Sequence, residues 1–386
     1  MTEEPIKVGV LFSRTGVTSV TEGSMLDATL FSIDEVNAAG GINGRELIPV
    51  TFDPGGDPIA YNALANRLLT ECGVRVIFGC YMSSSRKAVL RAVERRNGLL
   101  CYPAQYEGFE YSPNVIYCGA VPNQNSAQLG EYLLTNVGKR FYMVGSDYIW
   151  PRESDRIMSE LVLKHDGEVV ERGYLKLEAK RPAFKRLVSD IKRKRPDVIF
   201  CNFVGESIVH FYQAFAEAGL DPAAMPIASL TTSESDIRAM GVEAGAGHIT
   251  SATYFQSQNG LNNNACVKRY SEKFGGDVVT NMCWEAAYFQ VKIVAEALCR
   301  TNTDEIDILR PAILGAEFNA PQGRVRIDPD NAHTHVWPKI GRARPDGQFE
   351  ILSASEFAIR PDPYLANYNP HEWGAGLALR STSLLC

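Results

Sequence analysis

The feature that most constrains the fold is an alternation of short apolar segments with amphipathic segments of helical period, which the chain repeats in two series. The first series predicts strands at residues 7–12, 47–52, 76–78 and 99–102. Its helices are expected at 58–70, at 86–96 and around a face formed by Leu26, Leu30, Ile33 and Val36. Two strands joined by a helix normally run parallel to each other. The alternation therefore predicts an α/β protein with parallel sheets and helices on both faces.

A second series begins near Phe141. Its strands are predicted at 141–145, 169–175, 198–203 and 227–230, and its helices at 152–165, 184–194 and 208–218. A strand at 249–253, helices at 265–274 and 284–298, and a β-rich end at 325–327, 335–341 and 348–353 follow. Two similar halves without a flexible linker indicate two lobes, between which the chain crosses near residues 120, 250 and 330. The predicted N-terminal lobe is 1–120 plus 250–330, and the predicted C-terminal lobe is 121–249 plus 331–386.

Composition excludes several classes of protein. The 386 residues exceed what one hydrophobic core normally organises, and 45% hydrophobic with 22% charged residues is typical of a globular chain. The net charge of −6 argues against a broad basic surface, so we expect no direct nucleic-acid partner. No apolar run approaches the roughly 18 residues of a membrane helix, so we expect no membrane insertion.

The sequence favours a reducing compartment and no cofactor. The N-terminal segment lacks the basic and apolar regions of a secretory signal, and the nine cysteines include no CxxC pair, so a cytoplasmic location is expected. Gly40, Gly41 and Gly44 follow a helix and do not form a dinucleotide motif. The segment 53–57 lacks the Lys-Ser/Thr of a phosphate loop and is expected to be a turn. His333 and His335 have no neighbouring motif that would complete a metal site.

The most informative functional stretch is 79–108. The strands at 76–78 and 99–102 each lead directly into loops of aromatic and small hydroxyl residues, and the first loop opens a helix. In open α/β sheets, small molecules bind beyond the carboxyl ends of the strands. Tyr81, Ser83 and Tyr102 are therefore candidate contacts for a small polar ligand. The alternatives are that the two tyrosines are core aromatics and that Ser83–Ser85 only cap the helix.

A set of motifs, distributed in order over nearly the whole chain, indicates a family. They are Ala39-Gly-Gly-Ile-Asn-Gly-Arg45, Asp53-Pro-Gly-Gly-Asp57, Gly79-Cys-Tyr-Met-Ser83 with Arg86-Lys-Ala-Val89, Cys101-Tyr-Pro103, Tyr106-Glu-Gly-Phe-Glu-Tyr-Ser-Pro113, Pro122-Asn-Gln-Asn125, Gly145-Ser-Asp-Tyr148 with Pro151-Arg-Glu-Ser154, Ser229-Leu-Thr-Thr-Ser-Glu234 and Ile359-Arg-Pro-Asp-Pro-Tyr364. With these motifs the chain resembles the type I periplasmic-binding-protein family. Within it, the chain most resembles amide receptors that negatively regulate bacterial aliphatic amidase operons, and then urea- and short-amide-binding proteins of ABC transporters. The resemblance implies two Rossmann-like lobes around a central ligand cleft.

The resemblance also implies a ligand site for a small neutral amide or urea. Its residues are Tyr81, Ser83, Tyr102, Ala104, Tyr148, Trp150, Thr231 and Glu234. Such a ligand offers a carbonyl acceptor and an NH2 donor, and the Ser83 hydroxyl can pair with either. Backbone N–H groups at 84–86 are expected to bind the carbonyl oxygen, and Tyr102 with Tyr148 to enclose the ligand plane.

Two positions depart from the amide-receptor pattern. Ala104 replaces a threonine and is followed by Gln105 where proline is expected, and Trp150 replaces a tyrosine. The lost threonine hydroxyl removes one hydrogen bond, worth about 0.5–1.5 kcal/mol net. The tail at 359–364 favours the amide regulator, whereas the segment that follows Tyr102 is closer to the urea-binding branch. Both an amide and urea therefore remain candidates for the ligand.

The main functional hypothesis is a cytoplasmic amide sensor whose closure state depends on the ligand. The resemblance implies that its partner is an RNA-binding antiterminator protein, released when amide binds. The alternative is the solute-binding subunit of a urea or short-chain amide ABC transporter. Catalysis is not expected, because Cys101 stands in no recognisable nucleophile motif. A homo-oligomer is compatible with the sequence.

Overall fold

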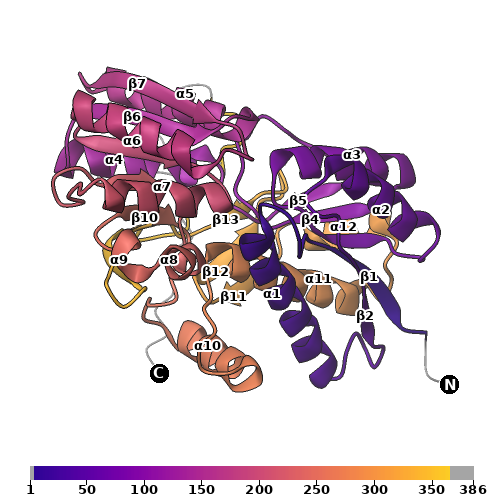
Figure 1. Ribbon diagram of the computed structural model, residues 1–386. Coiled ribbons are helices and arrows are strands. Elements are labelled where there is room, and N and C mark those ends of the chain that lie inside the picture. Colours follow the sequence, from indigo (N-terminus) through magenta and orange to yellow (C-terminus); the bar gives the residue numbers. More distant parts are fainter. Residues whose placement is uncertain (1–3, 366–386) are drawn as a thin grey trace. The chain divides into compact units, whose positions relative to one another are not determined.

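The computed structural model describes residues 4–365, which form two compact units (Figure 1). Unit 1 contains the described residues up to Ala120, together with Asn264–Val278 and Cys283–Val336. Unit 2 contains Val121–Asn263, Val279–Met282 and the described residues from Trp337. The chain therefore passes between the units after Ala120, Asn263, Val278, Met282 and Val336. The sequence predicted crossings near 120, 250 and 330, so residues 250–263, which were predicted for the N-terminal lobe, lie in unit 2 instead.

Unit 1 is built on a parallel sheet of five strands in the order β2-β1-β3-β4-β5. The strands are β1 (Ile6–Leu11), β2 (Leu47–Phe52), β3 (Val76–Gly79), β4 (Leu99–Tyr102) and β5 (Val115–Tyr117). All residues of β3 and β4 are buried, as expected for central parallel strands covered on both faces. The chain leaves β1 toward β2 on one side and later returns to β3 on the other. In open α/β sheets, small molecules bind where the strand order reverses, which in this sheet is at the carboxyl ends of β1 and β3.

Helices cover both faces of this sheet, as the alternation predicted (Figure 1). On one face, α2 (Pro58–Thr70) packs against α3 (Ser83–Arg96), and Asn62 Nδ2 donates to the carbonyl of Ala88 at 2.7 Å. On the other, α1 (Ser19–Ala38) lies beside α11 (Met282–Thr301), and Ser32 Oγ donates to the carbonyl of Tyr288 at 2.9 Å. Unit 1 also contains most of α10 (Leu261–Phe274), α12 (Ile306–Ile313) and an antiparallel sheet of β11 (Glu317–Ala320), β12 (Gly323–Ile327) and β13 (Thr334–His335).

Unit 2 has a seven-stranded sheet in the order β15-β14-β10-β9-β8-β6-β7. Its parallel part consists of β6 (Arg140–Ser146), β7 (Glu168–Leu175), β8 (Val198–Asn202), β9 (Ile227–Ser229) and β10 (Ile249–Ala252). Two antiparallel strands, β14 (Lys339–Ala343) and β15 (Phe349–Ala354), extend one edge. Because β6 lies between β7 and β8, the strand order reverses here too, at the carboxyl ends of β6 and β8.

The helical elements of unit 2 connect these strands. They are η1 (Pro122–Gln124), α4 (Ser126–Asn136), α5 (Ile149–Lys164), α6 (Arg181–Lys194), α7 (Glu206–Glu217), α8 (Glu234–Met240) and α9 (Val242–Gly245). Their placement agrees with the two-lobed α/β architecture predicted from the alternation. No helix within residues 4–365 is both long and apolar enough to cross a lipid bilayer.

One predicted strand is wrong in its extent. Residues 335–341 do not form a continuous strand, because β13 ends at His335 in unit 1 and β14 begins at Lys339 in unit 2. Pro338 lies between them, and a proline has no N–H to donate to a sheet. The apolar character of this segment therefore comes from two short strands of different sheets.

Candidate functional site

Four of the predicted site residues lie at the carboxyl ends of β3 and β4 in unit 1. Tyr81 follows β3, Ser83 begins α3, Tyr102 is the last residue of β4, and Ala104 follows it. The structure brings Tyr81 and Tyr102 into direct contact, because the Tyr102 hydroxyl donates to the carbonyl oxygen of Tyr81 at 2.6 Å. The loop after β3 is therefore tied to the end of β4.

The backbone turns sharply at Cys80, and this turn sets the direction of the loop that follows β3. Cys80 has φ of 71°, a left-handed conformation that a residue with a side chain rarely adopts. Its N–H donates to the carbonyl of Leu11 at 3.0 Å, which holds the turn against the end of β1. Strain of this kind costs about 1–3 kcal/mol and is found preferentially at functional sites.

The hydroxyl groups at the start of α3 do not cap it. The N-cap is Met82, in extended conformation, and no side chain makes a capping hydrogen bond there. Ser85 Oγ donates to the carbonyl of Met82 at 2.8 Å, and Ser83 Oγ donates to Glu107 Oε2 at 2.6 Å. The interpretation of Ser83–Ser85 as a simple helix cap is therefore wrong.

Part of the predicted backbone site is also wrong. The N–H of Arg86 donates to the carbonyl of Met82 at 3.0 Å, so it closes the first helical turn and is not available to a ligand carbonyl. The predicted helix began at residue 86, whereas α3 begins at Ser83. The N–H groups at the helix start are consequently those of the residues before Arg86.

Tyr102 is completely buried, and the ring has a cation above it. The guanidinium carbon of Arg86 lies 5.0 Å from the Tyr102 ring centroid. This geometry fits the alternative of a core aromatic at a strand end. Ala104 is also buried, and its backbone packs closely against Gly119, where an added Cβ would lie 2.1 Å from the Ala104 carbonyl. Contact of Tyr102 and Ala104 with a ligand stays a prediction.

The sequence did not predict the buried ion cluster beneath Ser83. The Arg86 side chain is fully buried and donates to Glu107 Oε1 at 3.0 Å and to Glu110 Oε1 at 2.8 Å. Burial opposes its charge, but Tyr102 and the two carboxylates outweigh burial and raise the pKa of Arg86. Arg86, Glu107 and Glu110 belong to the motifs that indicate the family, but their spacing along the chain does not predict that they form a cluster.

The sequence also did not predict a second polar cluster, which lies at the carboxyl end of β1. Glu22 Oε2 accepts from the N–H of Ser13 at 2.7 Å and from the Tyr61 hydroxyl, and Glu22 Oε1 accepts from Thr18 Oγ1 at 2.6 Å. Burial raises the pKa of Glu22, although these hydrogen bonds lower it in part. Ser13 Oγ in turn accepts from the N–H of Gly56 at 2.9 Å. The cluster therefore fixes both loops at the ends of β1 and β2.

In unit 2, Tyr148 and Trp150 follow β6, where the strand order reverses. Tyr148 is the N-cap of α5 in extended conformation, and its N–H donates to the carbonyl of Ser146 at 2.9 Å. Tyr148 is half-buried, whereas Trp150, in the first turn of α5, is 4% exposed. Beneath this loop, burial raises the pKa of Asp155 to about 7, although it accepts hydrogen bonds from Tyr174 and Asn202.

Thr231 and Glu234 follow β9. Thr231 Oγ1 donates to the carbonyl of Phe203 at 2.8 Å, which ties this loop to the end of β8. Glu234 begins α8, is 1% exposed, and accepts at Oε1 from the N–H of Gln256 at 2.8 Å. Burial raises the pKa of Glu234 to about 8, and its Oε2 has no hydrogen-bond partner among the described residues. Near neutral pH this side chain is therefore largely a protonated carboxylic acid.

The groups that could suggest catalysis or metal binding are buried. Cys101 is fully buried within β4, and burial raises the pKa of its thiol well above the ordinary value. His333 lies 4.2 Å from the Tyr117 ring in a stacked arrangement, and burial lowers its pKa to about 4. Within the part of the chain that the structure describes, no group of three His, Cys, Asp or Glu side chains could hold a metal ion.

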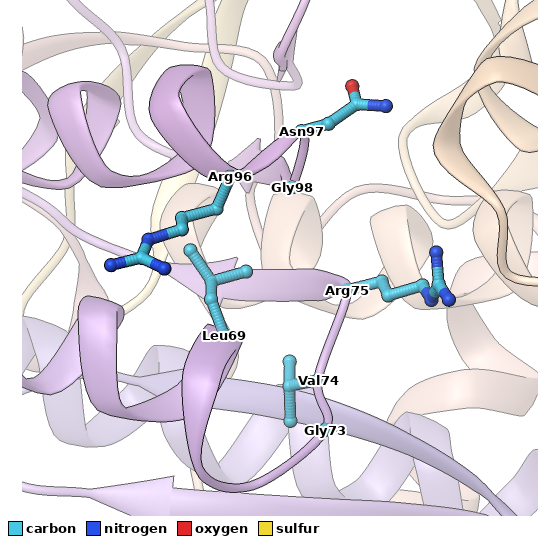
Figure 2. A pocket seen from close by; sticks show the side chains of 7 residues that line it. All are labelled: Leu69, Gly73, Val74, Arg75, Arg96, Asn97 and Gly98. Atoms are coloured by element: carbon cyan, nitrogen blue, oxygen red, sulfur yellow. The ribbon is translucent and has the colours of Figure 1, made fainter.

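A surface cavity of about 230 Å³ lies away from these strand ends (Figure 2). It is lined by Leu69, Gly73, Val74, Arg75, Arg96, Asn97 and Gly98, at the amino ends of β3 and β4. Figure 2 shows the Arg75 and Arg96 side chains extending in opposite directions. Arg75 is already paired with Glu305 at 2.5 Å. The two arginine side chains of the lining therefore do not converge on the cavity, and the sequence did not predict it.

Comparison with known proteins identifies the family of this chain. A model of the periplasmic binding protein domain matches residues 6–370. The chain is 23% identical over 333 residues to a Leu/Ile/Val-binding protein homolog of Brucella melitensis, covering 83% of this chain and 84% of that protein. A second match, 28% identical over 128 residues to a limonene hydroxylase of Geobacillus stearothermophilus, spans 33% of this chain and 23% of the hydroxylase.

Solved structures share the architecture. A solute binding protein of an ABC transporter from Rhodopseudomonas palustris BisB5, in complex with 3,4-dihydroxy benzoic acid, has a TM-score of 0.82 at 21% identity, covering 91% of this chain and 97% of that one. A branched-chain amino acid transporter substrate binding protein from Streptococcus pneumoniae, in complex with isoleucine, has a TM-score of 0.79 at 16% identity, covering 91% and 99%. At these identities the likeness shows the fold alone.

Proposed function

We propose that this chain, which belongs to the periplasmic binding protein domain family, binds a small polar solute at the carboxyl ends of its parallel strands and presents it to the permease of an ABC transporter. The observation that carries the solute-binding part is the position of the polar and aromatic loops. In each unit they follow parallel strands, and the loops with Tyr81 and Tyr148 follow β3 and β6, which lie where the strand order reverses. Open α/β sheets bind small molecules at this point.

The transport part is supported by the similar proteins. One relative is named as a Leu/Ile/Val-binding protein homolog, and the structures from Rhodopseudomonas palustris are named as solute binding proteins of ABC transporters. Since these names describe solute binding and not regulation, the permease replaces the antiterminator protein as the proposed partner. Fractionation of the native gene product tests the location. Transport requires an extracytoplasmic protein, whereas a cytoplasmic protein would favour the sensor.

Within this function, we propose a short amide or urea as the solute. Support comes from the aromatic side chains of Tyr81 and Tyr148 after β3 and β6, and from the hydroxyl of Ser83 at the start of α3. A ligand of four heavy atoms at a ceiling of about −1.5 kcal/mol each gives roughly −6 kcal/mol, or a Kd of tens of micromolar. We also propose that the ligand is not hydrolysed, because the buried Cys101 thiol is held protonated.

Isothermal titration calorimetry of the full chain tests the proposal. The panel contains acetamide, propionamide, butyramide, urea, leucine and 4-hydroxybenzoate. Ser83→Ala should weaken binding of the preferred solute at least about tenfold, since a buried hydrogen bond to the ligand is lost. Ser85→Ala is the matched control, because the Ser85 hydroxyl bonds within α3, and it should leave the Kd within about threefold.

Tyr148→Ala tests unit 2 in the same assay. A large loss of affinity in this variant would place the end of β6 in solute binding. Absence of heat with every member of the panel, in protein whose circular dichroism shows a folded state, would contradict the proposed function.

A further inference from the structure

The hydrogen bond of Ser83 restricts what its hydroxyl can offer to a ligand. A serine hydroxyl has one proton and two lone pairs. Ser83 Oγ donates that proton to Glu107 Oε2 at 2.6 Å, a short distance typical of a charge-assisted bond. Both side chains are buried, at 2% and 4% exposed. With its proton committed, Ser83 can only accept a hydrogen bond from a ligand.

The direction of this bond is set by the ion cluster. Arg86 Nη2 lies 3.0 Å from the other oxygen of Glu107, so Glu107 is a carboxylate in an ion pair and has only acceptor atoms. Arg86 is itself fixed by Glu110, whose Oε1 also accepts from the Tyr117 hydroxyl at 3.1 Å. The guanidinium carbon lies 4.4 Å from the Tyr106 ring centroid. Glu107 is therefore held in place from several sides and cannot readily turn away from Ser83.

We propose that the Arg86–Glu107 pair makes Ser83 an acceptor and thereby selects ligands that present an N–H group, such as a primary amide or urea, over carboxylates of the same shape. Glu107 is a specificity-determining residue that acts through Ser83. This inference rests on the proposed function, because it requires that Ser83 contact the solute.

The preference for amides over carboxylates follows from the number of hydrogen-bond donors that the ligand and Ser83 provide. A carboxylate ligand has no proton for Ser83, so either two acceptors face each other or Ser83 turns its proton to the ligand and leaves Glu107 without that donor. An unsatisfied buried acceptor costs enough to weaken binding by roughly tenfold to a hundredfold. Charge acts in the same direction, because Arg86 is opposed by two carboxylates, Glu107 and Glu110. Lys87 Nζ, 3.8 Å from Glu107, is 48% exposed and is screened by solvent.

Isosteric pairs of ligands test this selection directly. Titration of the full chain at neutral pH with acetamide and acetate, butyramide and butyrate, and benzamide and benzoate compares molecules of nearly equal size. In the unmodified chain, we expect the amide of a bound pair to bind at least about tenfold more tightly than the acid. Glu107→Gln provides an amide donor to Ser83 and frees the hydroxyl proton for the ligand. Its ratio of amide to acid affinity should fall toward one or reverse.

Glu110→Gln is the matched control. It removes the same charge from the partners of Arg86 but makes no bond to Ser83. We expect it to leave the amide-to-acid ratio within about threefold of the original value. An equal change of the ratio in both variants would overturn the inference, since the charge of the cluster would then decide the selection. Ser83→Ala provides a second test if Glu107→Gln does not fold, and its ratio should also fall toward one.

The outcomes separate this inference from the proposed function. Tighter binding of the acids in the unmodified chain, or binding of leucine without any member of the pairs, would overturn the inference and leave solute binding intact. Absence of binding to every amide, acid, urea and leucine would overturn both.

Discussion

Replacing Arg86 by methionine tests whether the ion cluster holds the end of the unit 1 sheet together. Arg86 is fully buried and bonds Glu107 at 3.0 Å and Glu110 at 2.8 Å. Methionine keeps much of the length of the side chain, so the main change is that two buried carboxylates lose their countercharge. Breaking a buried pair in this way costs about 3–5 kcal/mol. We expect Arg86→Met to lower the free energy of unfolding of unit 1 by about that amount.

Urea denaturation followed by circular dichroism measures the change, and amide hydrogen exchange of peptides from residues 76–117 assigns it to unit 1. Arg67→Ala, in α2 of the same unit, is the control. Arg67 also lies over an aromatic ring, at 4.8 Å from the Phe52 centroid, and pairs with Glu71 at 3.4 Å, but its side chain is 54% exposed. Exposed pairs are worth about 0–1 kcal/mol, so this variant should lose little stability.

The combined variant Arg86→Met, Glu107→Gln and Glu110→Gln distinguishes the effect of buried charge from the effect of lost packing. Because it removes the stranded carboxylates as well, it should recover at least half of the lost stability. If Arg86→Met lost no more unfolding free energy than Arg67→Ala, the ion cluster would not stabilise the end of the unit 1 sheet. No recovery in the combined variant would show that the loss came from packing and not from buried charge.

Two other predictions concern titration and close packing. Since burial raises the pKa of Glu234 from 4.5 to about 8, its stabilising contribution is present at acid pH and is lost as the pH rises through 8. Glu234→Gln should therefore remove a decline of up to about 1.4 kcal/mol per pH unit between pH 6 and 8, and parallel denaturation profiles in both proteins would contradict this. Gly119→Ala should destabilise unit 1 by about 1–3 kcal/mol or more, because the new Cβ would lie 2.1 Å from the Ala104 backbone. Gly260→Ala, which meets nothing within 4 Å, should leave the melting temperature nearly unchanged, and equal melting temperatures for all three proteins would contradict the prediction.

The predicted boundaries of local elements were close where the pattern was periodic. The strand predicted at 76–78 is β3 (Val76–Gly79), and the helix predicted at 58–70 is α2, with the same bounds. The helix predicted from residue 86 begins three positions earlier, at Ser83, because the extended conformation of Met82 starts it without any side-chain cap. β5 has three residues, too few for a period to be read, and no strand was predicted there.

The candidate site was predicted only in part. The sequence placed Tyr81, Ser83 and Tyr148 beside strand ends, because a loop after a strand can be read from local order. It could not show the partner of Ser83. Glu107 is 24 residues away, and Arg86, which fixes it, is 21 residues before it. Periodicity and motifs report neighbours along one element, whereas a hydrogen bond of this kind depends on how two loops are brought together.

The architecture of this protein can be predicted from its sequence alone. The alternation of apolar strands with amphipathic helices has few solutions other than parallel sheets covered on both faces, because each apolar face must be buried against the next element. In contrast, the folded structure is needed to show which polar groups are buried together, as in the Arg86–Glu107–Glu110 cluster and in the carboxyl group of Glu234. Burial strengthens electrostatic interactions and shifts pKa values, and burial depends on packing between segments far apart in the chain. The direction of the Ser83 hydroxyl therefore follows from the fold and not from the motif that contains it.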